Sequence, residues 1–582
     1  GNGNYTELAN KNIDTGMGLE RLAVVVQDVH SVFDIDTMKA IRDRICELAN
    51  VEYQTDEAKD VSIRLITDHI RSSTFMISDG IMPSNEGRGY VLRRIIRRAV
   101  RHGKLIGINR PFFMELCDAV ISENKAGYPE LIEKRELIAK VINNEEASFN
   151  KTVDQGLAML ETLTANGGVL SGDDAFKLYD TYGFPFDLTK DILAEKGMTV
   201  DENKFNELMK EQREKARNAR KASDGESWKS DGIAFDNISA TEFLGYTENT
   251  CTATILDIVS EGEHVANIQN GADAIIVLNK TVFYAESGGQ VGDTGYITNG
   301  EFNFSVTDTK KTADGIFTHS GKITNGSFAI GDTVTVTIDV ERRNAIRRNH
   351  TAAQLLQAGL RSVLGTHVEQ AGQLVNEKAV RFDFTHFSAL TTEEIAKVEA
   401  FVNNAILGGI TVKNEEMPID EAKKLGAMAL FGEKYGDVVR VVAADDTSIE
   451  LCGGTHVDNT AKIGLFHIVS ESSVAAGVRR IEAVTGLGVM NVIYANTALM
   501  NETVVNLKAQ NVAEIAKRAN AVMNELKETK QALEKAEAKL AGGKLDDILA
   551  KAVMVNDVKV AVAKIDGTAD DLRKMTDTAK AE

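Results

Sequence analysis

A thiol and an imidazole stand four positions apart in the segment Cys452-Gly453-Gly454-Thr455-His456. The two glycines let the backbone turn tightly, so both side chains can reach one borderline-soft divalent ion. Zinc is the first candidate, because a catalytic zinc site commonly has three protein ligands and keeps one position for water or substrate. His350 is the candidate third ligand. The alternative is that Cys452 is an ordinary buried thiol and that both histidines are surface or capping residues.

The composition limits the classes of protein in which this site can lie. A chain of 582 residues with 43% hydrophobic residues is too long for one core and is expected to form several domains. Its four cysteines have no paired spacing, and no run of eighteen apolar residues occurs, so we expect a cytoplasmic protein without disulfides or membrane spans. The charge of -20 repels polyanions, so a nucleic-acid contact needs a local basic patch. The start at Gly1, without Met, predicts a piece of a longer protein.

Helical spacing dominates residues 36–225, and one stretch of it is strongly basic. On a helix over 88–110, Arg93, Arg94, Arg97, Arg98 and Arg101 share a face, which indicates a phosphate-binding surface. The alternative is a solvated face neutralised by neighbouring acidic helices.

The polar segment 222–232 marks a domain boundary. After it, residues 235–340 alternate short β-branched runs with turns, which predicts a small antiparallel barrel or sandwich. Within it the glycine-rich stretch 283–295 allows close backbone approach to a ligand, or is a plain hairpin turn. Residues 341–490 mix helices and strands and contain every candidate metal ligand.

A heptad seam follows in the segment 498–541 and predicts a helix that pairs with another helix. The seam consists of Ile515, Ala519, Val522, Leu526, Thr529, Leu533, Ala536 and Leu540. We expect Gly542-Gly543 to end this helix and a strand-rich unit to begin after it.

Taken together, these segments resemble alanyl-tRNA synthetases, in the same order and over nearly the whole chain. Gly16-Met17-Gly18-Leu19-Glu20-Arg21 is similar to motif 3 of class II synthetases, in which the arginine contacts ATP, and Asp14 matches the residue that holds the amino group of alanine. Motifs 1 and 2 are missing upstream. The resemblance therefore implies that ATP and Mg²⁺ serve the full-length enzyme and that this piece does not activate alanine alone.

The resemblance also implies a tRNA-Ala partner. Pro83-Ser84-Asn85 and the segment 178–185 match family motifs in which Asn85 and Asp180 read the G:U pair of the acceptor stem. A carboxylate and an amide suit the guanine amino group exposed in the shallow RNA groove, while arginines such as Arg93, Arg94, Arg97 and Arg98 hold phosphates. Without the resemblance, the sequence predicts that Asn85 is a helix cap and Asp180 a turn residue.

Residues 341–490 resemble the family's editing domain, which hydrolyses tRNA mischarged with serine or glycine. Segments 381–384, 426–434 and 477–482 carry this match, and Gln370 matches a residue that lines the editing pocket. The family ligands come from a His-x-x-x-His helix and the Cys-x-x-x-His turn, but here Gln354 replaces the second histidine and Ala353 stands where relatives often have threonine. A zinc site of His350, Cys452 and His456, with Gln354 as a weaker ligand or bonded to a bound water, is then expected. A metal-free site held by hydrogen bonds is the alternative.

The predicted architecture is a multidomain α+β chain. Its parts are a remnant of the class II catalytic domain (1–35), a helical tRNA-recognition domain (36–232), a β-barrel (233–340), an α/β editing domain (341–492), a coiled-coil helix (493–543) and the start of a C-terminal α/β domain (544–582). The coiled coil and a missing C-terminal domain allow a homo-oligomer. The competing functions are a freestanding editing hydrolase and a non-catalytic RNA-binding or dimerisation module.

Overall fold

The computed structural model describes residues 12, 15–85, 87–165, 167–223, 234–235, 238–428, 436–475, 477–564, 572–573 and 575–577. The chain divides into two compact units, residues 1–486 and residues 487–582. Helices and sheets are mixed within the first unit, and each unit is described by itself below.

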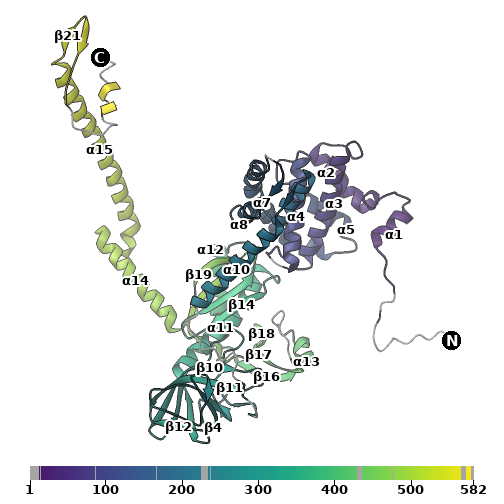
Figure 1. The fold of residues 1–582 in the computed structure, drawn as a ribbon, viewed down its shortest axis with the longest axis vertical. Helices are drawn as coiled ribbons and strands as arrows, with labels where there is room; N and C mark the ends of the chain where they lie inside the picture. The colour runs from purple at the N-terminus through teal and green to yellow at the C-terminus, as the bar shows by residue number, and fades with distance from the viewer. Residues whose placement is uncertain are drawn as a thin grey trace. The chain divides into compact units, whose positions relative to one another are not determined.

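Helices form the N-terminal part of the first unit (Figure 1). Apolar residues at three- and four-residue spacing turn each helix toward a shared core; on α3, Ile63, Ile66, Ile70 and Ile77 are all fully buried. The side chain of Asp56 caps that helix by accepting hydrogen bonds from two backbone amides. The helices are α1 (Leu19–Val26), α2 (Asp36–Ala49), α3 (Glu57–Ser78), α4 (Gly87–Leu105), α5 (Phe113–Asn124), α6 (Glu130–Glu133), α7 (Arg135–Thr164), α8 (Gly172–Asp180), α9 (Phe186–Glu195) and α10 (Glu202–Ser223), with the short strands β1 (Val169–Leu170) and β2 (Thr199–Val200).

A closed six-stranded barrel follows, rather than the sandwich that the sequence left open (Figure 1). The strands run in the order β13, β9, β10, β11, β7, β4, and an antiparallel pairing of β13 with β4 closes the ring. Inward-facing residues such as Phe304 and Val336 are fully buried, as the period-two alternation requires. The barrel strands are β4 (Thr250–Ser260), β7 (Asp273–Leu278), β9 (Gly295–Asn299), β10 (Phe302–Lys311), β11 (Phe317–Asn325) and β13 (Thr333–Ile338), accompanied by β3 (Glu242–Phe243), β5 (Glu263–His264), β6 (Asn267–Gln269), β8 (Lys280–Thr281) and β12 (Ser327–Ala329).

The last part of the first unit is an α/β layer that positions the candidate ligands. Helices α11 (Val340–Leu364) and α12 (Thr392–Leu407) share an apolar core with a four-stranded antiparallel sheet. That sheet has the order β14 (Gln370–Val375), β15 (Val380–Thr385), β20 (Val478–Thr485), β19 (Phe466–Ala475). A second sheet contains β16 (Val412–Pro418), β17 (Val438–Ala444) and β18 (Ser448–Leu451), with α13 (Ile419–Lys424) beside it.

The second unit consists of α14 (Leu487–Leu507), α15 (Ile515–Leu549) and the hairpin β21 (Val553–Val555) to β22 (Val558–Val560). The helix expected from residue 498 is interrupted after Leu507, where Lys508 adopts a left-handed conformation. The expectation that Gly542-Gly543 ends the heptad helix is wrong, because α15 continues to Leu549. Two glycines cost about 2 kcal/mol relative to alanine, and the strong helix formers on both sides outweigh that cost. Among the helices described, none is both long and apolar enough to cross a bilayer.

Candidate functional site

Three ligand atoms from two distant segments converge beside one cavity. Cys452 Sγ lies 3.5 Å from His350 Nε2 and 3.3 Å from His456 Nε2, and all three atoms lie within 4.8 Å of one another. Zn–S and Zn–N bonds of about 2.3 and 2.05 Å in a tetrahedron place sulfur and nitrogen about 3.6 Å apart. Both sulfur–nitrogen separations therefore fit a zinc ion.

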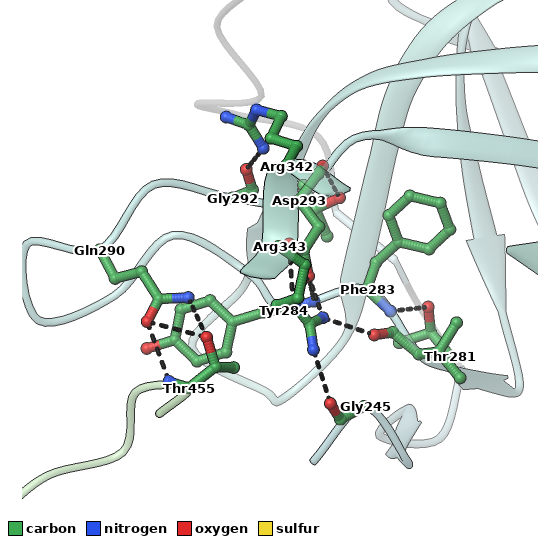
Figure 2. A network of polar contacts seen from close by, with 12 residues as sticks. Gly245, Thr281, Phe283, Tyr284, Gln290, Gly292, Asp293, Arg342, Arg343 and Thr455 are labelled. Atoms are coloured by element: carbon green, nitrogen blue, oxygen red, sulfur yellow. Dashed lines mark hydrogen bonds and ion pairs between the residues drawn. The ribbon is translucent and has the colours of Figure 1, made fainter. Parts of the chain in front are cut away.

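The position of His350 depends on Gln290, which sequence reasoning missed. Gln290 is fully buried, and its Oε1 accepts hydrogen bonds from His350 Nδ1 at 2.7 Å and from the Thr455 amide at 2.9 Å. Its Nε2 donates to Thr455 Oγ1 at 3.0 Å, as Figure 2 shows. Because the amide oxygen only accepts, Nδ1 of His350 carries the proton and Nε2 presents its lone pair toward Cys452.

A hydroxyl group orients the second imidazole in the same way. Thr351 Oγ1 donates to the Arg347 carbonyl and lies 3.1 Å from His456 Nδ1. Because the Thr351 hydroxyl donates its proton to the carbonyl, His456 Nδ1 donates to the hydroxyl oxygen. The lone pair of His456 Nε2 is then available to a metal ion. Burial lowers the pKa of His350 to about 4 and that of His456 well below its usual value, with the charge of Arg440 adding to both effects. Both imidazoles are thus neutral ligands at pH 7.

The turn that carries the sulfur is held from its outer side. Arg440 donates to the carbonyls of Cys452 and Gly454 at 2.9 and 2.8 Å, and its guanidinium stacks 4.2 Å from the Tyr246 ring centre. The Tyr246 hydroxyl donates to the Gly453 carbonyl at 2.6 Å. Position 454 must be glycine, because a Cβ atom there would lie 2.1 Å from the His350 ring.

A buried ion pair anchors the start of α11 to the glycine-rich segment (Figure 2). Arg343 is fully buried and pairs with Asp293 through Nε and Nη2, while Nη1 donates to the Gly245 carbonyl at 2.6 Å and Nη2 also donates to the Val282 carbonyl at 2.9 Å. The segment 283–295 is therefore a support that joins the barrel to α11 through Asp293 and Gln290.

Two of the three ligand residues, His350 and Cys452, border a cavity of about 460 Å³, the size of a small-ligand pocket. The predicted residues Gln354 and Gln370 line it together with His350 and Cys452, whereas His456 does not. Gln354 stands one helical turn after His350, and its Nε2 is buried with no hydrogen-bond partner in the described part of the chain. Glu450 also lines the cavity, where burial raises the pKa of its carboxyl group to about 7.

The residues predicted to read tRNA lie together in the helical part. Asn85 and Asp180 are exposed and line a second cavity, of about 370 Å³, with Arg93, Arg94 and Arg97. Arg93 donates to the Asn85 side chain, and Gln212, which was not predicted, donates to Asp180 at 2.5 Å. Asparagine and aspartate from two distant segments thus share one concave surface.

Acidic helices neutralise most of the arginine face, as the alternative in the sequence analysis described. Arg93 and Arg97 both pair with Glu145 of α7, at 3.2 and 2.6 Å. Helix α9 supplies the other partners: Asp187 for Arg94 at 3.4 Å, Asp191 for Arg98 at 3.1 Å and Glu195 for Arg101 at 2.5 Å. Arg98 does not line the second cavity, and Arg97 is almost wholly buried. These side chains position helices as well as offering charge.

The residues similar to motif 3 lie apart from both cavities. Gly16 and Gly18 precede α1, which contains Arg21, and the only ion pair of this helix among the described residues joins Glu20 to Arg71 at 2.6 Å. Asp14 lies outside the described residues.

The residues that support the ligand group differ in whether a sequence pattern could have revealed them. Thr351 directly follows His350 and could have been found as its neighbour. Gln290 lies in the glycine-rich stretch 283–295, which the pattern marked without singling out this side chain. Tyr246 and Arg440 are separated from the ligands along the chain, and no local pattern marks them.

Comparison with known proteins shows the family to which the chain belongs. Residues 1–342 match the family model described as class II tRNA synthetases (A), and residues 439–482 match that of the threonyl and alanyl tRNA synthetase second additional domain, which contains the Cys452 turn. Over 97–100% of its length the chain is 53% identical to alanine–tRNA ligase 1 of Lachnoclostridium phytofermentans and 52% identical to the alanine–tRNA ligase of Acetivibrio thermocellus. It spans about two thirds of these relatives, 67% and 65% of their respective lengths. The chain therefore belongs to the alanyl-tRNA synthetase family.

Proposed function

We propose that this chain carries the acceptor-stem recognition and editing functions of an alanyl-tRNA synthetase. The editing reaction is hydrolysis of the ester of tRNA-Ala mischarged with serine or glycine, and the whole enzyme joins alanine to tRNA-Ala with ATP and Mg²⁺. The observation that carries the editing proposal is the cluster of His350, Cys452 and His456, of which His350 and Cys452 line a cavity of ligand size.

Zinc is the proposed resident of the three-ligand group, because two neutral imidazoles and a thiol at these separations suit it. When bound, the ion supplies either activation of a water or orientation of the tRNA end. The chain's own residues do the rest: Gln290 and Thr351 fix the tautomers of the two histidines, and Arg440 fixes the turn. Gln354 and Gln370 supply polar groups that position the aminoacyl ester in the cavity.

Acceptor-stem recognition is proposed for the second cavity. Asp180 accepts and Asn85 both donates and accepts, which suits the guanine amino group of a G:U pair in the shallow groove of RNA. Both side chains are exposed at one concave surface, and the partly exposed guanidinium groups of Arg93, Arg94 and Arg98 are available to phosphates.

A pairing role is proposed for α15. Its heptad positions Leu526 and Leu533 are 47% and 57% exposed. An apolar seam of this kind is buried when a second helix packs against it, which supports a homo-oligomer.

The test of the editing proposal is deacylation of seryl-tRNA-Ala by this chain, with and without a zinc chelator. Cys452→Ala should abolish hydrolysis while the thermal unfolding profile of the apo protein stays the same. Turnover by Cys452→Ala equal to that of the unmodified chain would remove the thiol from the site. Complete absence of hydrolysis by the unmodified chain, loaded with zinc, would favour a non-catalytic RNA-binding module instead.

A further inference from the structure

Two glutamine side chains on α11 present polar atoms that nothing in the fold satisfies. Gln354 and Gln357 are each 6% exposed and both line the cavity beside the ligand group. Nε2 of Gln354 and Oε1 of Gln357 are buried and have no hydrogen-bond partner among the described residues. Buried polar atoms are almost always bonded, because each unpaired one loses its hydration without compensation. Two of them in one cavity wall indicate a polar ligand.

The two atoms are complementary in kind and close in position. One is a donor and the other an acceptor, and residues three apart on a helix are neighbours on its surface. Their helix is firmly held, since Leu355 and Leu356 between them are fully buried in the core of the α/β layer. The pair therefore stands ready for a group that donates one hydrogen bond and accepts another. An alcohol does both with a single oxygen atom, whereas a methyl group does neither.

The place of this pair relative to the ligand group identifies the alcohol. Gln354 follows His350 by one turn on the same helix face, and Ala353, which also lines the cavity, leaves that wall open at Cβ. An ester held near His350 and Cys452 would thus have its amino-acid side chain within reach of α11. We infer that Gln354 and Gln357 together read the side-chain hydroxyl of a seryl ester, an inference that rests on the proposed editing function.

The two glutamines favour binding of a seryl ester over an alanyl ester. An alanyl ester has the same β-carbon as a seryl ester but no hydroxyl, so it offers neither a donor nor an acceptor to the two amides. Gln354 thus acts as a specificity residue rather than as a fourth metal ligand.

The experiment compares Gln354→Met and Gln357→Met, which keep side-chain length and remove the hydrogen bonds. The matched control is Gln373→Met, because Gln373 lines the same cavity but its amide already donates to the Gly288 carbonyl at 2.6 Å. Deacylation of seryl-tRNA and glycyl-tRNA is measured for each variant, together with zinc affinity and binding of an amide-linked seryl-adenosine that cannot be hydrolysed.

Each of the two α11 variants should lower kcat/KM for the seryl substrate about tenfold more than for the glycyl substrate. Each should also raise the dissociation constant of the seryl analogue by a similar factor. The effects should not add in the double variant, since one hydroxyl bonds to both amides. The Gln373→Met control should change both rates by the same factor. An equal loss for the two substrates, or a loss of zinc affinity in Gln354→Met that accounts for the lost rate, overturns the inference while editing itself stands. Hydrolysis of neither substrate by the unmodified chain overturns the proposed function and this inference with it.

Discussion

Gln290 is the residue on which the geometry of the ligand group most depends, and Gln290→Met tests this. The substitution removes the acceptor of two buried donors, His350 Nδ1–H and the Thr455 amide, and the donor to Thr455 Oγ1. His350 and Thr455 are each only 2% exposed, so water does not replace the lost partner. Each unpaired buried group costs about 1–3 kcal/mol.

The imidazole can escape part of that cost by moving its proton to Nε2, but it then no longer presents a lone pair to a metal. Loss of such an orienting partner typically weakens metal binding about 10- to 100-fold, which corresponds to roughly 1.4–2.7 kcal/mol. We therefore expect the zinc dissociation constant of Gln290→Met to rise by that factor, and the stabilisation by zinc to shrink accordingly.

The assay is competition for zinc against a chromophoric chelator at pH 7.5, combined with thermal unfolding with and without the metal. Gln373→Met is the control, because Gln373 donates to the carbonyl of Gly288 in the same loop and, in the described part of the chain, makes no hydrogen bond to any of the three ligands. A zinc affinity within twofold of that of the unmodified chain would refute the claim that Gln290 sets the histidine tautomer.

Three further predictions follow from buried or cavity-lining charges. Asp293→Ala should lower the free energy of unfolding by about 3–5 kcal/mol, because Arg343 is left charged and fully buried; a loss below 1 kcal/mol in urea denaturation would show that the pair is not needed. Asp180→Ala should reduce discrimination between G:U and G:C acceptor stems about tenfold while general RNA affinity changes little, and a uniform loss on all stems would contradict its assignment. His319 donates from Nδ1 to the Ile276 carbonyl and accepts from a buried hydroxyl at Nε2, and burial lowers its pKa to about 4. Below pH 6.5 the His319 side chain binds a proton in the unfolded chain but stays neutral in the folded barrel. His319 should therefore lower the free energy of unfolding by about 2 kcal/mol at pH 5 and leave it unchanged at pH 7.5. Equal dependence of the unfolding free energy on pH in the unmodified chain and in His319→Gln would disprove this.

Patterns of short range were readable from the sequence because the interactions that form them are local. Period-two alternation predicted an antiparallel barrel or sandwich, and helical spacing predicted the helices of the first part. The turn from Cys452 to His456 needed only two glycines to bring its two ligands together. Even here the sequence erred once: Gly542-Gly543 lowers helix propensity, but the residues around it carry α15 through to Leu549.

The sequence by itself determined which chemical groups this protein has: a thiol and an imidazole at ligand spacing, a stripe of arginines, and an amide four residues after His350. Only the tertiary structure decided what those groups meet. It placed His350 beside Cys452 and buried Gln290 at hydrogen-bond distance from His350. It also paired Arg93 with a carboxylate of α7 and Arg94 with one of α9. The physical reason is that hydrogen bonds and charge pairs act over a few ångströms in space, so their partners are set by the packing of helices and strands and not by distance along the chain.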